Sequence, residues 1–384
     1  EALYIHYTQT CDMDNKEILS LIALQHIPGI GSITAKRLIE SIGSATQIFE
    51  LRTELPSLIP NVQPSLVKAL DCPSAHRRAE QELSFIDKHH IPCLGYNDEA
   101  YPSRLRECDD APILLFYRGN TNLNPHRIVS IVGTRKRTDY GRDLLERFVR
   151  DLSAQLPEVL IVSGLAYGID VCAHRAAIKY GLPTVGVLAH GLDRIYPSVH
   201  RNVAAQMTQC GGMLTEYVSF PEPERQNFLQ RNRIVAGMAD ATLIVESAAK
   251  GGALVTANIA NSYGRDCFAF PGRVDDYASA GCHRLIRNHQ AALIPSADDF
   301  IEAMMWDTPQ SGRPDAIQRT LFPELSDEEN RIVELLEQYV DGAHINTLVV
   351  EADIPINRLT ALLFELELRG IVRPLAGSSY KLIR

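Results

Sequence analysis

The alternation of short apolar segments with helix-length stretches between about Pro92 and Met305 constrains the fold of this chain most. Seven segments have the pattern of buried strands: IVSIVG, VLIVSG, TVGVLA, GMLTEY, ATLIVES, CFAFPG and AALIP. Strands that alternate with helices usually pair in parallel, and the helices then cover both faces of the sheet. The sequence therefore predicts an α/β core built on a parallel sheet.

Glycine and polar residues concentrate directly after these strands. The segments SGLAYGIDVCAH, HGLDRIYPSVHR, ESAAKGGALVTA and PGR each follow a predicted strand. Ligands of open parallel sheets bind at the carboxyl ends of the strands. We therefore expect these loops to form one crevice.

The first of these loops carries a run of cations. In SIVGTRKRTDYG a predicted strand ends at Gly133, and Arg135, Lys136 and Arg137 follow before a helix expected from about Asp139. Free N–H groups at the helix start and the cations together favour a phosphate site. The run lacks both the glycines of a dinucleotide fingerprint and a Walker loop. A solvated basic helix start is the alternative interpretation.

The N-terminal region reads as a small helical domain. Apolar residues at helical spacing occur in ILSLIALQHI and ITAKRLIESI, and IPGIGSITAKRLIE resembles a helix-hairpin-helix. In that motif Ser32 or Thr34 would cap the second helix and Lys36 and Arg37 would lie near a phosphate. A packing module that touches no ligand is an equally good interpretation.

The C-terminal region predicts a winged helix. SDEENRIVELLEQ begins with an N-cap serine, two further amphipathic helices follow, and IVRPLAGSSYKLI reads as a hairpin. The face with Asn357, Arg358 and Arg369 also carries Glu365 and Glu367, so protein contact or regulation is favoured over DNA binding. From residue 321 onwards there are eleven carboxylates and six Lys or Arg, out of a net charge of −9 for the chain.

Length and composition indicate several domains and a reducing environment. The 384 residues exceed one compact core, no apolar run has membrane-spanning length, and the eight cysteines form no C-x-x-C pair. We expect a cytoplasmic protein with neither metal site nor membrane contact. The predicted domains are a helical helix-hairpin-helix or SAM-like domain (1–90), the sheet core (91–308), a linker (309–322) and the winged helix (323–384).

Seven motifs in order resemble a known family. GTRKRTDYG, SGLAYGID, GLDRIYP, RNRIVAG, GGALVTA, PGR and GCHRLI, from about Tyr101 to Ile294, look like the DNA-processing protein A family, DprA or Smf. The resemblance implies an extended Rossmann-like core, a homodimer, single-stranded DNA bound in a basic pocket and contact with RecA recombinase in natural transformation. It implies no established catalytic activity and no cofactor.

Carried over to this sequence, the family's pocket arginine corresponds to Arg135. Many relatives have a lysine at the position of Ser198, and Arg201, three residues further along, could replace that phosphate contact. Leu229 and Gly251 also depart from the family, without a change of charge.

The nucleic-acid-binding residues predicted from the motifs and the charges come from the loops and from one helix. They are Gly133, Thr134, Arg135, Lys136, Thr138, Gly164, Gly168, Gly191, Tyr196, Ser198, Arg201, Arg231, Arg233, Lys250, Gly252 and Thr256. Tyr140, Tyr167, Tyr196 and Phe228 offer rings for base stacking. Arg231 and Arg233 cannot face the same way on a helix, so one should pair with a carboxylate such as Glu246 or Asp240.

The function predicted from these observations is non-catalytic binding of single-stranded DNA that promotes RecA loading during DNA uptake. The alternative is a nucleotide-processing enzyme of the phosphoribohydrolase (lysine-decarboxylase-like) fold group, which the core resembles more distantly. Those enzymes carry G-G-x-G-T-x-x-E where this chain has GGALVTANI, with Leu254 in place of a glycine and Asn258 in place of the glutamate. Asp170, His174, His190 and Asp193 could serve acid–base chemistry, although structural roles are favoured.

Overall fold

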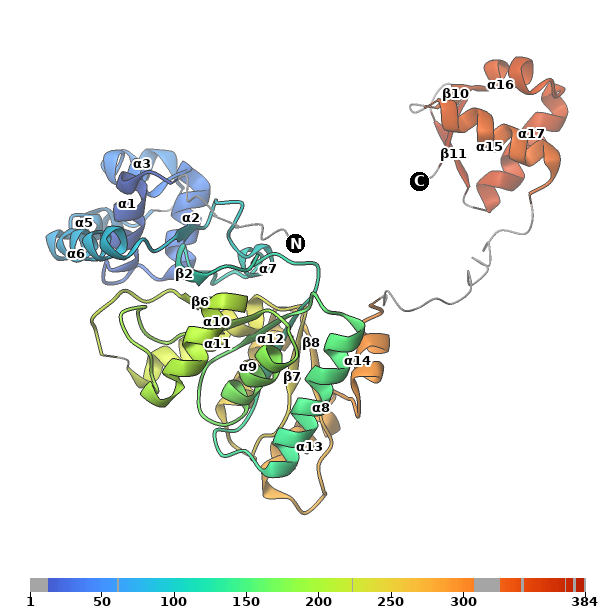
Figure 1. The fold of residues 1–384 in the computed structure, drawn as a ribbon. Coiled ribbons are helices and arrows are strands. Elements are labelled where there is room, and N and C mark those ends of the chain that lie inside the picture. The colour runs from blue at the N-terminus through green and yellow to red at the C-terminus, as the bar shows by residue number, and fades with distance from the viewer. Residues whose placement is uncertain are drawn as a thin grey trace, which may run out of the picture. The chain divides into compact units, whose positions relative to one another are not determined.

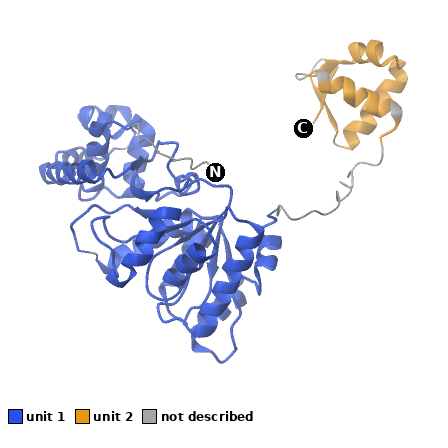
Figure 2. Ribbon diagram, in the orientation of Figure 1, with its two compact units in different colours: residues 1–309 blue, residues 310–384 orange. Residues whose placement is uncertain are grey.

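The chain divides into two compact units, residues 1–309 and residues 310–384 (Figure 2). The computed structural model describes residues 13–60, 62–222, 224–306, 325–339, 342–369, 371–375 and 378–382. The predicted linker, 309–322, lies outside the described residues. The boundary near residue 90 stays a prediction, because the first unit contains both the N-terminal helices and the sheet.

A sheet of nine strands, in the order β1-β2-β6-β5-β4-β3-β7-β8-β9, forms the centre of the first unit (Figure 1). The strands from β6 to β9 in this order pair in parallel, which confirms the predicted α/β fold. The antiparallel strands β1 and β2 extend one edge, and the sequence pattern did not predict them. The strands are β1 (Cys93–Gly95), β2 (Leu114–Gly119), β3 (Ile128–Val132), β4 (Leu160–Ser163), β5 (Thr184–Val187), β6 (Gly211–Thr215), β7 (Ala241–Ile244), β8 (Asp266–Ala269) and β9 (Ala292–Leu293).

Helices cover both faces of this sheet, because neighbouring residues of a strand point to opposite faces. Val129 and Ile131 of β3 pack in one hydrophobic cluster with residues of α8, α9 and α14. Ile128 and Val132 belong to a second cluster that includes residues of α11, α12 and α13. The helices are α8 (Asp139–Gln155), α9 (Ile169–Lys179), α10 (Arg201–Cys210), α11 (Arg225–Gly237), α12 (Gly252–Ser262), α13 (Ala280–Arg287) and α14 (Ala297–Ala303), with the 3₁₀ turns η1 (Ser198–His200) and η2 (Tyr277–Ser279).

The strand order reverses at β3. The chain runs outward from β3 through β4, β5 and β6, and β7 then returns to the other side of β3. The connection after β3 leads to α8 on one face, and the connection after β7 leads to α12 on the other. Two connections that leave in opposite directions open a crevice between them at the carboxyl ends of the strands.

The N-terminal helices pack against the edge of the sheet that carries β1 and β2 (Figure 1). Gly31 caps α2 without a side-chain hydrogen bond, so the predicted cap from Ser32 or Thr34 is wrong. Lys36 is mostly buried and donates to the backbone carbonyl of Cys108 (3.0 Å), which turns it away from any phosphate. The helices are α1 (Asn15–Gln25), α2 (Ser32–Ile42), α3 (Ala45–Glu50), α4 (Leu55–Leu58), α5 (Pro64–Leu70), α6 (Pro73–His89) and α7 (Ser103–Arg106).

The second unit is a winged helix, as predicted. Ser326 and Glu329 form a capping box at the start of its first helix. Arg358 pairs with Glu328 and Arg369 pairs with Glu329, so carboxylates neutralise both arginines of the face considered above. The elements are α15 (Asp327–Gln338), β10 (Ala343–His344), α16 (Ile345–Ala352), α17 (Ile356–Leu368), β11 (Val372–Leu375) and β12 (Ser379–Leu382).

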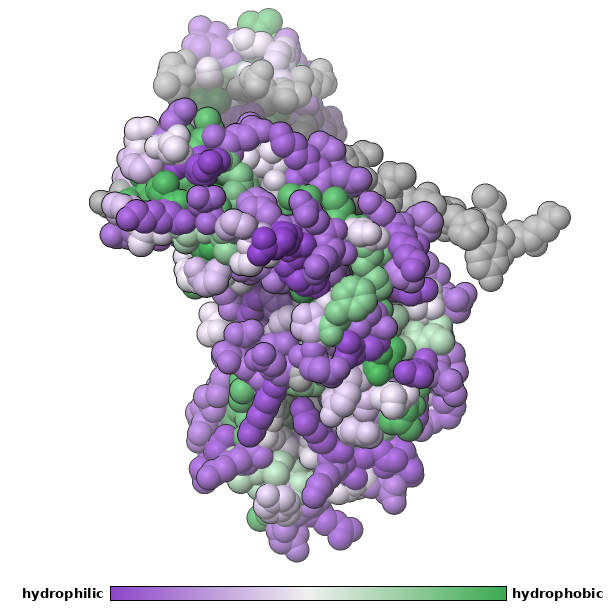
Figure 3. All heavy atoms as spheres, turned by 90° about the vertical axis from the view of Figure 1, so that its left-hand side faces the viewer, coloured by the Kyte–Doolittle hydropathy of each residue, from purple (hydrophilic) through white to green (hydrophobic). Residues whose placement is uncertain are grey.

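The surface seen from the side of the N-terminal helices is mostly hydrophilic, and its hydrophobic residues form small, separate patches (Figure 3). Among the described helices none combines the length and the apolar character needed to span a membrane. No disulfide bond joins cysteines within the described ranges.

Candidate nucleic-acid interface

A cavity of about 700 Å³ lies in the crevice where the connections after β3 and β7 separate. We call it the sheet-edge cavity. The loops after β3, β4 and β7, the start of α12 and one side of α11 form its walls. The predicted site residues that line it are Gly133, Thr134, Arg135, Gly164, Tyr196, Arg231, Lys250, Gly252 and Thr256.

Glu246, at the end of β7, holds the loop that carries the cations. Its carboxylate accepts hydrogen bonds from the backbone N–H of Thr138 (3.0 Å) and from the Thr138 hydroxyl, while its carbonyl accepts from the N–H of Thr134 (2.8 Å). The Thr138 hydroxyl in turn accepts from the N–H of Gly141 and so caps α8. The loop is therefore tied at both ends, and Thr138 has a structural role outside the cavity lining.

Arg135 is the exposed cation at the mouth of the cavity. Its guanidinium lies over the ring of Phe228, 5.7 Å from the centroid, and Phe228 meets the ring of Tyr196 edge-on at 5.8 Å. No carboxylate among the described residues pairs with Arg135. A cation without a counter-ion beside two aromatic rings can bind a phosphate and a base together.

Arg231 lies deeper in the same cavity and is 4% exposed. It donates to the carbonyl oxygens of Gly164 (2.6 Å) and Val187, so much of its hydrogen-bonding capacity is used within the protein. A Cβ atom at Gly164 would overlap both the Arg231 guanidinium and the Asp170 carboxylate. Only glycine at position 164 leaves room for these two charged groups at the bottom of the cavity.

Arg233 faces the opposite side of α11 from Arg231, as expected for residues two positions apart on a helix. It pairs with Glu216, which corrects our prediction of Glu246 or Asp240 as the partner. Glu246 is occupied by Thr138, and Asp240 pairs with Arg104 at 2.5 Å. Arg233 lines a different cavity, so the structure separates it from the other predicted site residues.

The remaining predicted residues are not among those that line the sheet-edge cavity. Lys136, Ser198 and Arg201 are exposed, and Gly168 is the N-cap of α9. Gly191 packs against the backbone of Ser219, where a Cβ atom would lie 2.6 Å from the Cα of Ser219. Their role as contacts for a nucleic acid stays a prediction.

Three further polar residues, from α11 and from the loop after β7, line the cavity and were not predicted from the sequence. These are Arg225, Asn232 and Ser247. Arg225, Phe228, Leu229 and Asn232 recur at the spacing of one helix face, and that periodicity could have identified Arg225 and Asn232. The signal was hidden because the same helix carries polar residues on its opposite side as well.

The groups considered for acid–base chemistry have structural partners. Burial raises the pKa of Asp170, opposed by the charge of Arg231. Burial lowers the pKa of His174 to about 3, and its Nδ1 donates to the Thr184 hydroxyl (2.7 Å). His190 bonds to Gly191 through Nδ1 and to Tyr196 through Nε2, while Asp193 pairs with Arg194.

Comparison with known proteins agrees with this architecture. The family model described as DNA recombination-mediator protein A matches residues 92–305, and the DprA winged helix domain model matches residues 318–378. The chain is 38% identical over 223 residues to DNA processing protein DprA of Streptococcus pneumoniae, covering 56% of this chain and 78% of that protein. This chain therefore belongs to the DNA recombination-mediator protein A family.

Two solved structures of related proteins share the fold. DNA processing protein A from Streptococcus pneumoniae matches with a TM-score of 0.58 and 30% identity, over 76% of this chain and 98% of that one. DNA processing protein A from Helicobacter pylori, described for its single-stranded DNA binding mode, matches with a TM-score of 0.51 and 30% identity, over 57% and 98% of the two chains.

Proposed function

We propose that this chain binds single-stranded DNA in the sheet-edge cavity. The observation that carries the proposal is Arg135, an exposed guanidinium that has no carboxylate partner among the described residues and is stacked on Phe228 at the mouth of a crevice. A phosphate would bind Arg135, and a base would stack on Phe228 or Tyr196. The Helicobacter pylori relative, described for binding single-stranded DNA, supports the same ligand here.

The charge of the cavity lining suits a polyanion. Arg135, Arg225, Arg231 and Lys250 line it together with a single carboxylate, Asp170. Lys250 and Arg225 are exposed at its rim. These local cations would attract the backbone although the whole chain is acidic, because the potential depends on how the charges are distributed.

A recessed crevice suits a single strand better than a duplex. A duplex is read by a helix or ribbon that protrudes into a groove, whereas a flexible strand can enter a crevice and stack its bases on aromatic rings. We infer that the ligand is a strand with unpaired bases.

We propose that the bound strand is handed to RecA recombinase in the cytoplasm during DNA uptake, without catalysis. Membership of a recombination-mediator family supports this role.

A nucleotide-processing enzyme is the weaker candidate. Asn258, at the position of those enzymes' glutamate, is exposed and is not among the residues that line the cavity, while Leu254 is buried in the core.

Two measurements distinguish strand binding from nucleotide processing. One is a titration with labelled oligothymidine, and the other is an assay of ribose release from nucleoside monophosphates. Saturable binding of the oligonucleotide without release of ribose is the expected result. Release of ribose at a rate above the uncatalysed reaction would assign the cavity to the enzyme function instead.

We further propose that the protein acts as a homodimer, as the family resemblance implies. One cavity offers few cations, whereas two joined cavities gain affinity from their effective concentration. Affinity should therefore rise steeply once an oligonucleotide is long enough to reach both protomers, and a variant made monomeric should lose this step. The same length dependence in monomer and dimer would refute bridging.

A further inference from the structure

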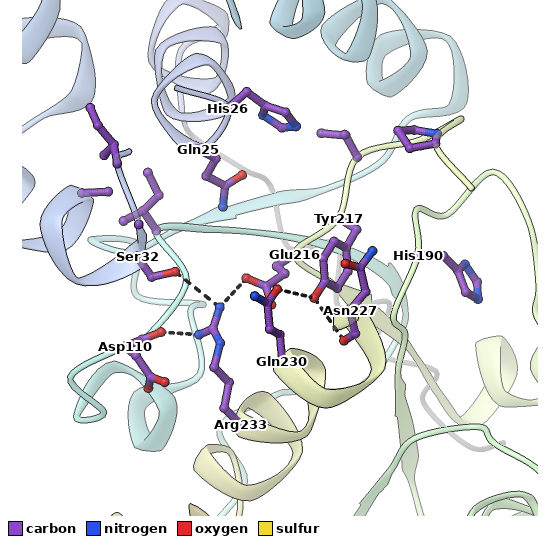
Figure 4. Close-up of a pocket in the computed structure, with 16 residues that line it drawn as sticks. Gln25, His26, Ser32, Asp110, His190, Glu216, Tyr217, Asn227, Gln230 and Arg233 are labelled. Atoms are coloured by element: carbon purple, nitrogen blue, oxygen red, sulfur yellow. Dashed lines mark hydrogen bonds and ion pairs between the residues drawn. The ribbon is translucent and has the colours of Figure 1, made fainter. Parts of the chain in front are cut away.

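A second cavity, of about 620 Å³, lies on the other side of α11 (Figure 4). We call it the α11 cavity. Gln25 and Ser32 reach into it from the N-terminal helices, Glu216 comes from the loop after β6, and Asn227 and Gln230 come from α11. Its volume is within the range of sites that bind small organic groups, about 300–1,000 Å³.

The α11 cavity does not suit a phosphate. Its one arginine, Arg233, pairs with Glu216 and also donates to the backbone carbonyl of Asp110 and the hydroxyl of Ser32 (3.4 Å). Two carboxylates, Asp110 and Glu216, line the cavity together with Arg233, so no excess of positive charge remains for an anion. Burial raises the pKa of Glu216, and the charge of Arg233 opposes that shift.

The cavity does offer neutral hydrogen-bonding groups, above all three carboxamides. Gln25 donates to the carbonyl of Leu114 (3.2 Å), and its Oε1 is buried and accepts no hydrogen bond from the part of the chain that the structure describes. The carboxamide of Asn227 makes no hydrogen bond to the described residues, and Gln230 accepts a single one, from the Tyr217 hydroxyl (3.4 Å). A carboxamide presents a donor beside an acceptor, which matches the edge of a nucleobase.

A small cavity of about 60 Å³ shares lining residues with both larger ones. It shares Arg135, Tyr196 and Phe228 with the sheet-edge cavity, and it shares His190 with the α11 cavity. Through these shared residues the small cavity adjoins both larger ones. The aromatic rings of Tyr196 and Phe228 line both the sheet-edge cavity and the small cavity.

We propose that the α11 cavity is a nucleobase subsite for the strand whose backbone occupies the sheet-edge cavity, with Asn227 as its principal hydrogen-bonding residue. The proposal rests on the proposed function, because the backbone must first bind at Arg135. It adds a base-contacting surface formed jointly by the N-terminal helices and α11. The strand then passes from phosphate contacts, across the aromatic rings, to a base in the α11 cavity.

The test compares Asn227→Ala with the wild type on two oligonucleotides of equal length, one of thymidines and one with abasic residues along its whole length. Both carry the same phosphates, so they differ only in their bases. The matched control is Gln226→Ala, which removes a neighbouring exposed carboxamide of α11 that lines neither cavity. Titration at one salt concentration gives a dissociation constant for each protein variant with each oligonucleotide.

Asn227→Ala should weaken binding of oligothymidine by about fivefold to tenfold, as expected for one or two neutral hydrogen bonds, and should leave binding of the abasic strand unchanged. Gln226→Ala should change neither. Equal effects of Asn227→Ala on both strands, or no effect on either, would overturn the subsite. Failure of the wild type to bind either strand would instead overturn the proposed function.

Thymidine added alone distinguishes a base within a strand from a free nucleoside. We expect thymidine at millimolar concentration to compete weakly with oligothymidine for the wild type and to compete less for Asn227→Ala. Tight binding of thymidine that depends on Asn227, with oligonucleotide binding that does not, would assign the cavity to a free nucleoside and overturn the path proposed for the strand.

Discussion

At the scale of single residues, α11 uses two arginines in two different ways. Arg231 is buried under the sheet-edge cavity, where it braces the ends of β4 and β5 through the carbonyls of Gly164 and Val187. Arg233 joins α11 to the N-terminal helices and to the loop after β6 through Ser32 and Glu216. Both side chains stabilise the walls of cavities, while Arg135 stays exposed for a ligand.

His174 provides a residue-scale prediction for the effect of pH. Its pKa is lowered to about 3, so below its unfolded pKa of 6.5 the unfolded chain binds a proton that the folded chain does not. The free energy of unfolding should therefore fall as the pH falls below about 6.5. Urea denaturation gives the free energy of unfolding at about pH 7.5 and at about pH 5. The loss between these two pH values should be smaller in His174→Asn, whose side chain cannot titrate, than in the wild type. An equal loss in both proteins would contradict the lowered pKa of His174.

At the scale of elements, the sequence predicted the strands better than the loops between them. The segments of β3 to β9 are apolar enough to be recognised, whereas β1 has only three residues. The segment of β2 is just as apolar, so the same criterion could have identified it. The crevice could be predicted because parallel strands end on the same side. The pairing of Arg233 with Glu216 could not, because it depends on how the loop after β6 folds back onto α11.

The loop from β6 to α11 also contacts α6. Glu82, 2% exposed, accepts hydrogen bonds from the backbone N–H of Ser219 (2.9 Å) and its hydroxyl (3.0 Å), and pairs with Arg78 (2.9 Å). This contact fixes the part of the loop that precedes α11. The N-terminal helices thus support one wall of the sheet-edge cavity.

Glu82→Ala should lower the free energy of unfolding by about 1–3 kcal/mol, because buried donors of Ser219 and Arg78 lose their acceptor. It should also weaken oligothymidine binding, since α11 carries Phe228 and Arg231. Chemical denaturation and titration measure the two effects. Glu80→Ala, an exposed substitution on the same helix, is the control, and equal behaviour of the two variants would remove Glu82 from this role.

At the scale of the whole molecule, the two units differ in the groups that they offer to a ligand. The sheet-edge cavity belongs wholly to the first unit. The second unit is acidic, and carboxylates pair with its Arg358 and Arg369. We therefore expect the winged helix to serve protein contact or regulation rather than to hold the strand.

Removal of residues 310–384 should leave the affinity for oligothymidine within about twofold of the full chain, because an acidic unit repels a polyanion rather than attracting it. Titration of the truncated and full-length proteins at equal salt measures this, with circular dichroism to verify folding. A loss of affinity of tenfold or more, in a folded truncated protein, would place strand contacts in the winged helix.

The central claim is that Arg135 binds a phosphate of single-stranded DNA, and the salt dependence of oligothymidine binding tests it most directly. Between about 50 and about 200 mM salt, Arg135→Ala should show a slope of log affinity against log salt that is shallower by about 0.7, with a loss of about 1–3 kcal/mol in binding free energy. Arg147→Ala, which removes an exposed cation of α8 outside the cavity, should keep the wild-type slope. An unchanged slope in Arg135→Ala, or the same change in both variants, would contradict the account.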